Sequence, residues 1–151
     1  MATHDVDLPY HPERATTLVV GCCDGRYLRA MERFLKRRGI DLHDLVTMPG
    51  GPARLCFETA PFLEYQDTLE AIELMVDLHG TRRIVLIAHA DCAYYVKRHG
   101  TSEMPRQCDD LAAAASLLRS RLPQVDVDLY YLRPHRGSFA VDEVPPPAEV
   151  V

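Results

Sequence analysis

Continuous apolar runs alternate along this chain with stretches in which apolar residues recur every three or four positions. The run at residues 18–22 is typical of a strand buried on both faces, residues 44–48 predict a second, short strand, and residues 83–88 predict the strongest strand in the sequence. The periodic stretches predict helices at residues 26–39, 58–79 (one or two helices), 91–98 and 107–122. This alternation predicts a single α/β domain with a mainly parallel sheet flanked by helices.

The C-terminal third of the chain has a different pattern. Two apolar segments, 125–132 and 138–144, are joined by the short polar connection 133–137, which predicts an antiparallel hairpin at the sheet edge. Residues 49–52, Pro-Gly-Gly-Pro, predict a loop without regular structure. The expected organisation is an N-terminal arm (1–16), one domain (17–144) and a flexible proline-rich tail (145–151).

Composition narrows the choice of partners and compartment. The chain has 151 residues and a formal net charge of −5, so it lacks the basic surface that nucleic acids or anionic membranes attract. We find no apolar run of transmembrane length and no signal-peptide pattern, and we therefore expect a cytoplasmic protein. Five cysteines, an odd number, favour metal ligands and free thiols over a disulfide framework.

Two of the predicted parallel strands end in side chains that bind metals. Cys22 follows the first strand, and His89 and Cys92 follow the strand over 83–88. Because parallel strands present their carboxyl ends at one sheet edge, these three side chains are expected to meet there. Two thiolates and one imidazole suit Zn²⁺ and leave a fourth position for water or substrate.

Asp24 and Arg26 stand just beyond Cys22 and form a carboxylate–guanidinium pair. Asp24 is a candidate for the fourth ligand or for the acceptor of a proton from zinc-bound water. The neighbouring Cys23 is expected to pack in the core.

The motifs Cys22-x-Asp24-x-Arg26 and His89-x-x-Cys92 together resemble those of the β-class carbonic anhydrases, and the likeness covers roughly residues 17–142. The resemblance implies a zinc lyase that reversibly hydrates carbon dioxide to bicarbonate through a zinc-bound hydroxide. In it, Cys22, His89 and Cys92 would bind zinc. Asp24 would either coordinate the metal or turn to Arg26 and open the site. The family also implies a homodimer or an assembly of dimers.

Two departures from the family pattern leave alternatives open. Ala93 stands where the family usually has glycine, and no glutamine precedes Cys22, although family enzymes commonly use one upstream to bind substrate. One alternative is hydrolysis of a related small molecule, CS₂ or COS, at the same site. Another is a carbonic anhydrase-like protein that binds zinc without catalysis.

Overall fold

A five-stranded sheet forms the centre of the protein, and the computed structural model describes residues 1–146 of it. The strands follow the order β2-β1-β3-β4-β5 across the sheet. Their bounds are β1 (Thr17–Gly21), β2 (Asp44–Thr47), β3 (Arg83–His89), β4 (Asp126–His135) and β5 (Ser138–Glu143). Strands β1 to β4 pair in parallel, while β5 pairs antiparallel with β4 at the edge. The predicted fold class is confirmed, including the edge hairpin.

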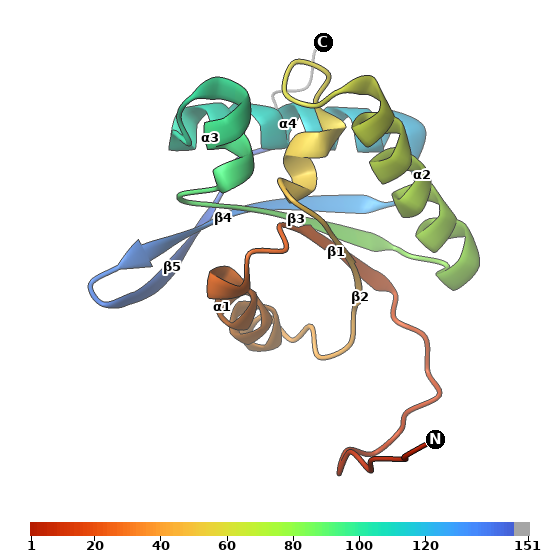
Figure 1. Cartoon of the computed structure of the whole chain (residues 1–151). Helices are drawn as coiled ribbons and strands as arrows, with labels where there is room; N and C mark the ends of the chain where they lie inside the picture. The colour runs from red at the N-terminus through yellow and green to blue at the C-terminus, as the bar shows by residue number, and fades with distance from the viewer. Residues whose placement is uncertain (147–151) are drawn as a thin grey trace.

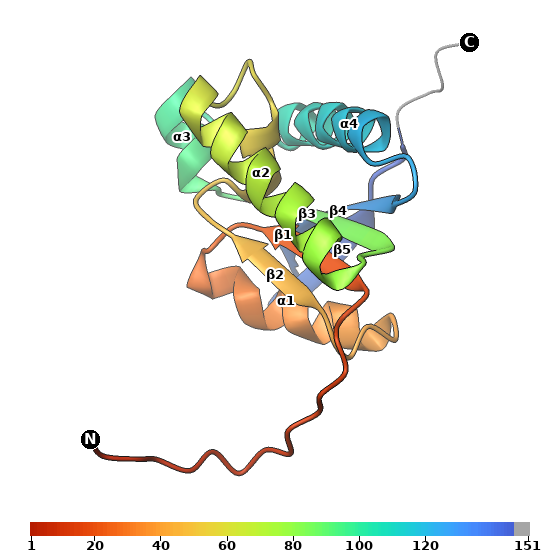
Figure 2. The same cartoon turned by 90° about the vertical axis from the view of Figure 1, so that its right-hand side faces the viewer.

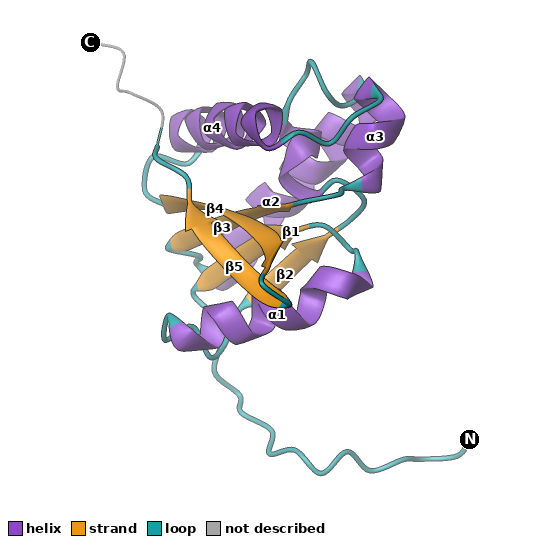
Figure 3. Ribbon diagram, turned by 90° about the vertical axis from the view of Figure 1, so that its left-hand side faces the viewer, coloured by secondary structure: helices purple, strands orange, loops and turns teal. Residues whose placement is uncertain are grey.

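Helices cover both faces of the sheet, so the protein has three layers (Figures 1 and 3). The helical segments are α1 (Gly25–Arg37), the 3-10 helix η1 (Gly51–Leu55), α2 (Phe62–His79), α3 (Ala93–His99) and α4 (Met104–Arg121). Helix α1 lies alone on one face, and the other helices lie on the opposite face.

The alternation of side chains along each strand divides the core between these two faces. On β3, Ile84, Leu86 and Ala88 pack toward α2 and α4. Val85 and Ile87 point the other way and pack with the buried side of α1. Because both faces are covered, β3 is buried from its second residue onward, which explains its uninterrupted apolar sequence.

The segments outside this core differ from it. Residues 1–16 form no helix or strand, and they extend away from the sheet as an arm that is almost entirely exposed (Figure 2). The proposed proline-rich tail falls mostly on residues 147–151, outside the described residues. Among the residues described, no helix is both long and apolar enough to cross a membrane.

Several predicted boundaries are wrong for local reasons. The glycine–proline segment is only partly a loop, because η1 begins at Gly51 with a proline in its first turn. The stretch 58–79 contains one helix, α2, which begins at Phe62, directly after Pro61. The short helix starts at Ala93 rather than at residue 91, because Asp91 has a φ of 53°, outside the helical region.

Candidate metal centre

The first candidate ligand, Cys22, comes directly after β1 at a point where a second segment approaches closely. The Cys23 N–H donates to the Met48 carbonyl (3.3 Å), and the Met48 N–H donates to the Gly21 carbonyl (3.3 Å). Gly51 allows this approach, since a Cβ there would lie 2.5 Å from the Gly21 carbonyl carbon. The loop after β2 therefore lies directly against the backbone on both sides of Cys22.

The other two candidate ligands come from the turn that follows β3. His89 is the last residue of the strand, and Cys92 is the N-cap of α3 in an extended conformation. Asp91, with its positive φ, makes the turn between them. Neither residue lies within α3, but the turn between them brings both side chains to the same place. One potential ligand atom from each of Cys22, His89 and Cys92 lies within 4.8 Å of the others.

His89 has the hydrogen bonding expected of a metal ligand. The residue is 3% exposed, and its Nδ1 lies 2.7 Å from the Ala90 carbonyl oxygen. A carbonyl can only accept, so Nδ1 carries the proton and Nε2 carries the lone pair. Nε2 is buried and has no hydrogen-bond partner among the described residues. A buried lone pair beside two thiols fits a bound cation, and this tautomer is the one a second-shell carbonyl usually selects in metal sites.

The two thiols are electrostatically coupled. Hydrogen bonding from Cys22 lowers the pKa of Cys92 to about 6; burial opposes this, and the N–H groups of Tyr95 and Tyr94 add to it. The same contact with Cys92, together with burial, raises the pKa of Cys22 to about 12. The metal-free pair therefore keeps one proton near neutral pH. A divalent cation would displace that proton, because metal binding requires both thiolates.

Asp24 and Arg26 form a separate pair beside this cluster. Asp24 caps α1 by accepting the Arg26 N–H (3.0 Å), and its Oδ2 accepts from the guanidinium Nη2 (2.6 Å). Hydrogen bonding to Arg26 is the main cause that lowers the pKa of Asp24 to about 2, so the carboxylate is ionised at neutral pH. The same guanidinium also donates to the Asp91 carbonyl (3.2 Å). Arg26 thus links the two halves of the site.

Apolar and aromatic groups surround the cluster. The Tyr27 ring lies 4.2 Å from the His89 ring, measured between centroids. A narrow cavity touches both Cys22 and His89 on the α1 side, and its remaining lining is Tyr27 and aliphatic or methionine side chains. Tyr94 packs against Gly50 on the other side, where its hydroxyl donates to Glu64 (2.6 Å). Cys23, by contrast, is exposed, so the expectation that it packs in the core is wrong.

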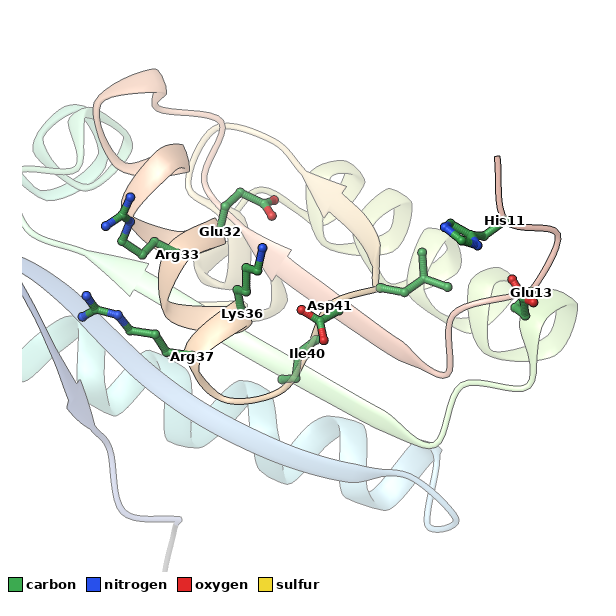
Figure 4. Close-up of a pocket in the computed structure, with 9 residues that line it drawn as sticks. His11, Glu13, Glu32, Arg33, Lys36, Arg37, Ile40 and Asp41 are labelled. Carbon is green, nitrogen blue, oxygen red and sulfur yellow. The ribbon is translucent and has the colours of Figure 1, made fainter. Parts of the chain in front are cut away.

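A wider hollow lies elsewhere and contains none of the candidate ligands. It runs between the arm and the C-terminal half of α1, with His11 and Glu13 at one end and Arg33, Lys36 and Arg37 toward the other (Figure 4). Cys22 and Asp24 adjoin the opposite, N-terminal end of this helix. The hollow is open and lined mostly by charged side chains, so we place the chemistry at the cysteine–histidine cluster.

Sequence reasoning missed Ser102 and Gln107, which are linked to the site through the backbone N–H of Cys92. The Ser102 hydroxyl accepts the Cys92 N–H (2.9 Å), and Gln107 donates to that hydroxyl (2.9 Å). A signal for Gln107 was present, because this polar residue lies four positions before Leu111 on the inward face of α4. Nothing in the local sequence marked Ser102.

Solved structures define the class of protein to which this fold corresponds. A carbonic anhydrase from Streptococcus mutans matches 91% of this chain and 87% of its own, with a TM-score of 0.60 and 15% identity. One of two tetrameric β-carbonic anhydrases from Sordaria macrospora matches 87% of this chain and 81% of its own, with a TM-score of 0.55 and 15% identity. The fold is that of the β-carbonic anhydrases.

Sequence comparison narrows this class to a family. The family described as "Putative carbonic anhydrase" matches residues 12–143, and the chain belongs to it. An uncharacterized protein of Rickettsia bellii is 29% identical over 122 residues, 75% of this chain and 73% of the relative. Another from Rickettsia conorii is 28% identical over 122 residues, 75% of this chain and 64% of that relative's length. The resemblance inferred from the motifs is confirmed.

Proposed function

We propose that the protein is a zinc enzyme that reversibly hydrates carbon dioxide to bicarbonate, with Cys22, His89 and Cys92 as the zinc ligands. The observation that carries the proposal is the buried Nε2 of His89, which has no hydrogen-bond partner within residues 1–146 and lies beside two thiols. Two sulfur ligands and one nitrogen ligand favour Zn²⁺ over harder cations, and three protein ligands leave one position open. When bound, zinc supplies a Lewis acid that lowers the pKa of a coordinated water toward about 7.

The chain's own residues would orient the reacting groups. Asp24, ionised and held by Arg26, can accept a hydrogen bond from a water at the open position. Its carboxylate is not among the three clustered ligand groups, and both of its oxygens contact Arg26. We therefore assign Asp24 to orienting water and Arg26 to holding Asp24, with coordination by Asp24 as the alternative state of the same side chain.

We further propose that the working form is a cytoplasmic homodimer or an assembly of dimers. The cavity that Cys22 and His89 line is narrow, and its lining does not include Cys92 among the described residues, which supports a substrate cleft that a second copy completes. A reducing compartment would also keep the two thiols free to bind metal. Light scattering coupled to size-exclusion chromatography tests the assembly, and a monomer at micromolar concentration would contradict it.

The adjacent cysteines provide a matched test of the site. Purified protein should contain one zinc per chain and accelerate CO₂ hydration in a stopped-flow indicator assay between pH 7 and 9. Cys22→Ser should lose both zinc and activity. Cys23→Ser, one position along and exposed, should keep both.

The outcomes separate the competing functions. Stoichiometric zinc without CO₂ hydration across this pH range would refute the proposed reaction. Release of hydrogen sulfide from CS₂ or COS by the same sample would then identify the hydrolytic alternative. Inactivity toward all three substrates would favour a zinc-binding protein without catalysis. A protein without zinc would refute the metal site itself.

A further inference from the structure

A partly buried polar relay connects α4 to the backbone of Cys92. The first contact is the Cys92 N–H, which donates to the Ser102 hydroxyl oxygen at 2.9 Å. The second is the Gln107 side-chain amide, whose Nε2 donates to the same oxygen at 2.9 Å. Ser102 lies in the connection between α3 and α4, so one hydroxyl joins a candidate metal ligand to the core of the protein.

Gln107 sits in a position that normally holds an apolar residue. It is fully buried (0% exposed), on the same inward face of α4 as Leu111, Ala114 and Ala115. Its Oε1 has no hydrogen-bond partner among the described residues, which makes this amide costly for folding. A leucine at this position would stabilise the fold at least as well as an amide that is only partly hydrogen-bonded. What glutamine provides here, and leucine could not, is the hydrogen bond to Ser102.

The contact matters because of where Cys92 sits. Cys92 is the N-cap of α3, and its carbonyl accepts the Val96 N–H of that helix at 3.2 Å, whereas its own N–H is held by the Ser102 hydroxyl. The preceding Asp91 has left-handed backbone geometry, and its carbonyl accepts from Arg26 at 3.2 Å. The turn from His89 to Cys92 is therefore fixed on one side by Arg26 and on the other by Ser102.

We infer that Ser102 and Gln107 are positioning residues that set the distance between the Cys92 sulfur and the imidazole of His89. This inference rests on the proposed zinc site and extends it to residues outside the ligand set. Second-shell partners of this kind orient ligands, and removing one typically lowers metal affinity about 10–100-fold. The two residues fix the geometry of the turn and take no part in the reaction itself.

The test measures zinc affinity in variants that remain folded. Zinc dissociation constants are obtained by competition with a chromogenic chelator, and the thiolate-to-metal absorption of the cobalt(II) form reports ligand geometry. Ser102→Ala should weaken zinc binding about 10–100-fold and shift the cobalt spectrum. Ser102→Thr retains the hydroxyl and should restore both. Ser116→Ala is the matched control, since this exposed α4 serine bonds only the Ala112 carbonyl among the described residues (3.1 Å) and should change neither.

Gln107→Leu separates positioning from a purely structural role and serves if Ser102→Ala fails to fold. It removes the Gln107–Ser102 hydrogen bond together with the amide oxygen that lacks a partner among the described residues, and it leaves the Cys92–Ser102 bond in place, so the metal-free protein should be as stable as the wild type or more stable. Zinc affinity should nevertheless fall. Unchanged zinc affinity and cobalt spectrum in a folded Ser102→Ala or Gln107→Leu protein would overturn the inference while leaving the zinc site intact. A wild-type protein that binds no zinc would overturn the proposed function and this inference together.

Discussion

Replacement of Gly51 by alanine tests whether the close approach of the β2 loop to β1 builds the Cys22 side of the site. Gly51 has a φ of 48°, and an added Cβ would lie 2.5 Å from the Gly21 carbonyl carbon and 2.6 Å from the Cys22 nitrogen. Both atoms belong to the backbone, so no side chain can rotate to relieve the overlap. The loop or the end of β1 must move, and Cys22 moves with it.

The size of the effect follows from two contributions. A left-handed conformation costs a non-glycine residue about 1–2 kcal/mol, and overpacking of this kind costs about 1–3 kcal/mol. The free energy of unfolding should therefore fall by about 2–5 kcal/mol, which corresponds to a drop in melting temperature of roughly 4–20 °C for a chain of this length. Zinc affinity should fall as well, because the Cys22 sulfur is displaced from His89.

Gly100→Ala is the matched control. Gly100 also has a positive φ, 76°, but an added Cβ there has no neighbour within 4 Å in the part of the chain that the structure describes, so only the conformational cost of about 1–2 kcal/mol remains. Urea unfolding followed by circular dichroism on metal-free protein measures both variants, and chelator competition measures their zinc affinity. If the two variants lose the same stability and both bind zinc like the wild type, the close approach at Gly51 does not build the site.

Three further outcomes are expected. Asp24→Asn keeps the helix cap but loses the charge opposite Arg26. Because Arg26 lowers the pKa of Asp24 to about 2, the stabilisation that the Asp24 charge gives the folded protein is present above pH 4 and is lost as the pH falls toward 2. The difference in urea midpoint from the wild type should therefore be constant from pH 8 to 5 and shrink below pH 4; a difference that grows on acidification would contradict this. Tyr95→Phe removes a buried hydroxyl that donates to Asp110 (2.8 Å) and should cost about 1.5–3 kcal/mol in chemical unfolding, whereas a loss below 0.5 kcal/mol would contradict a charge-assisted bond. Removing zinc with a chelator should lower the melting temperature. For zinc present at 1,000 times its dissociation constant, the lost stabilisation is about 4 kcal/mol. Calorimetry that shows no shift in melting temperature would argue against zinc bound to the folded protein.

The sequence was sufficient to predict a mainly parallel sheet with an antiparallel edge hairpin, because strand segments alternate with amphipathic helices until the last two strands. It also predicted the meeting of Cys22, His89 and Cys92, since parallel strands place their carboxyl ends at one edge. These predictions depend on periodicity and topology alone. Both are averaged over many residues, so a single unusual residue does not disturb them.

The errors arose where one residue's backbone or a distant contact decides the outcome. The left-handed turn at Asp91 delays α3, and apolar periodicity carries no information about φ at one position. Cys23 is exposed although β1 is buried up to Gly21, because Cys23 lies two residues beyond the end of that strand. The Ser102 contact joins residues ten positions apart through a loop whose path depends on how α4 packs. Such contacts follow from tertiary packing, which local sequence does not record.

The double role of Asp24 couples the site to the start of a helix. Its Oδ1 caps α1, so a carboxylate that rotated toward Cys22 and His89 would leave the Arg26 N–H without its partner. Loss of such a cap costs about 0.5–2 kcal/mol and loosens the first helical turn. Rotation of the Asp24 carboxylate and fraying of the first turn of α1 are therefore coupled in a single equilibrium. Amide hydrogen exchange at Arg26 and Tyr27 would report, from the backbone, which way Asp24 points.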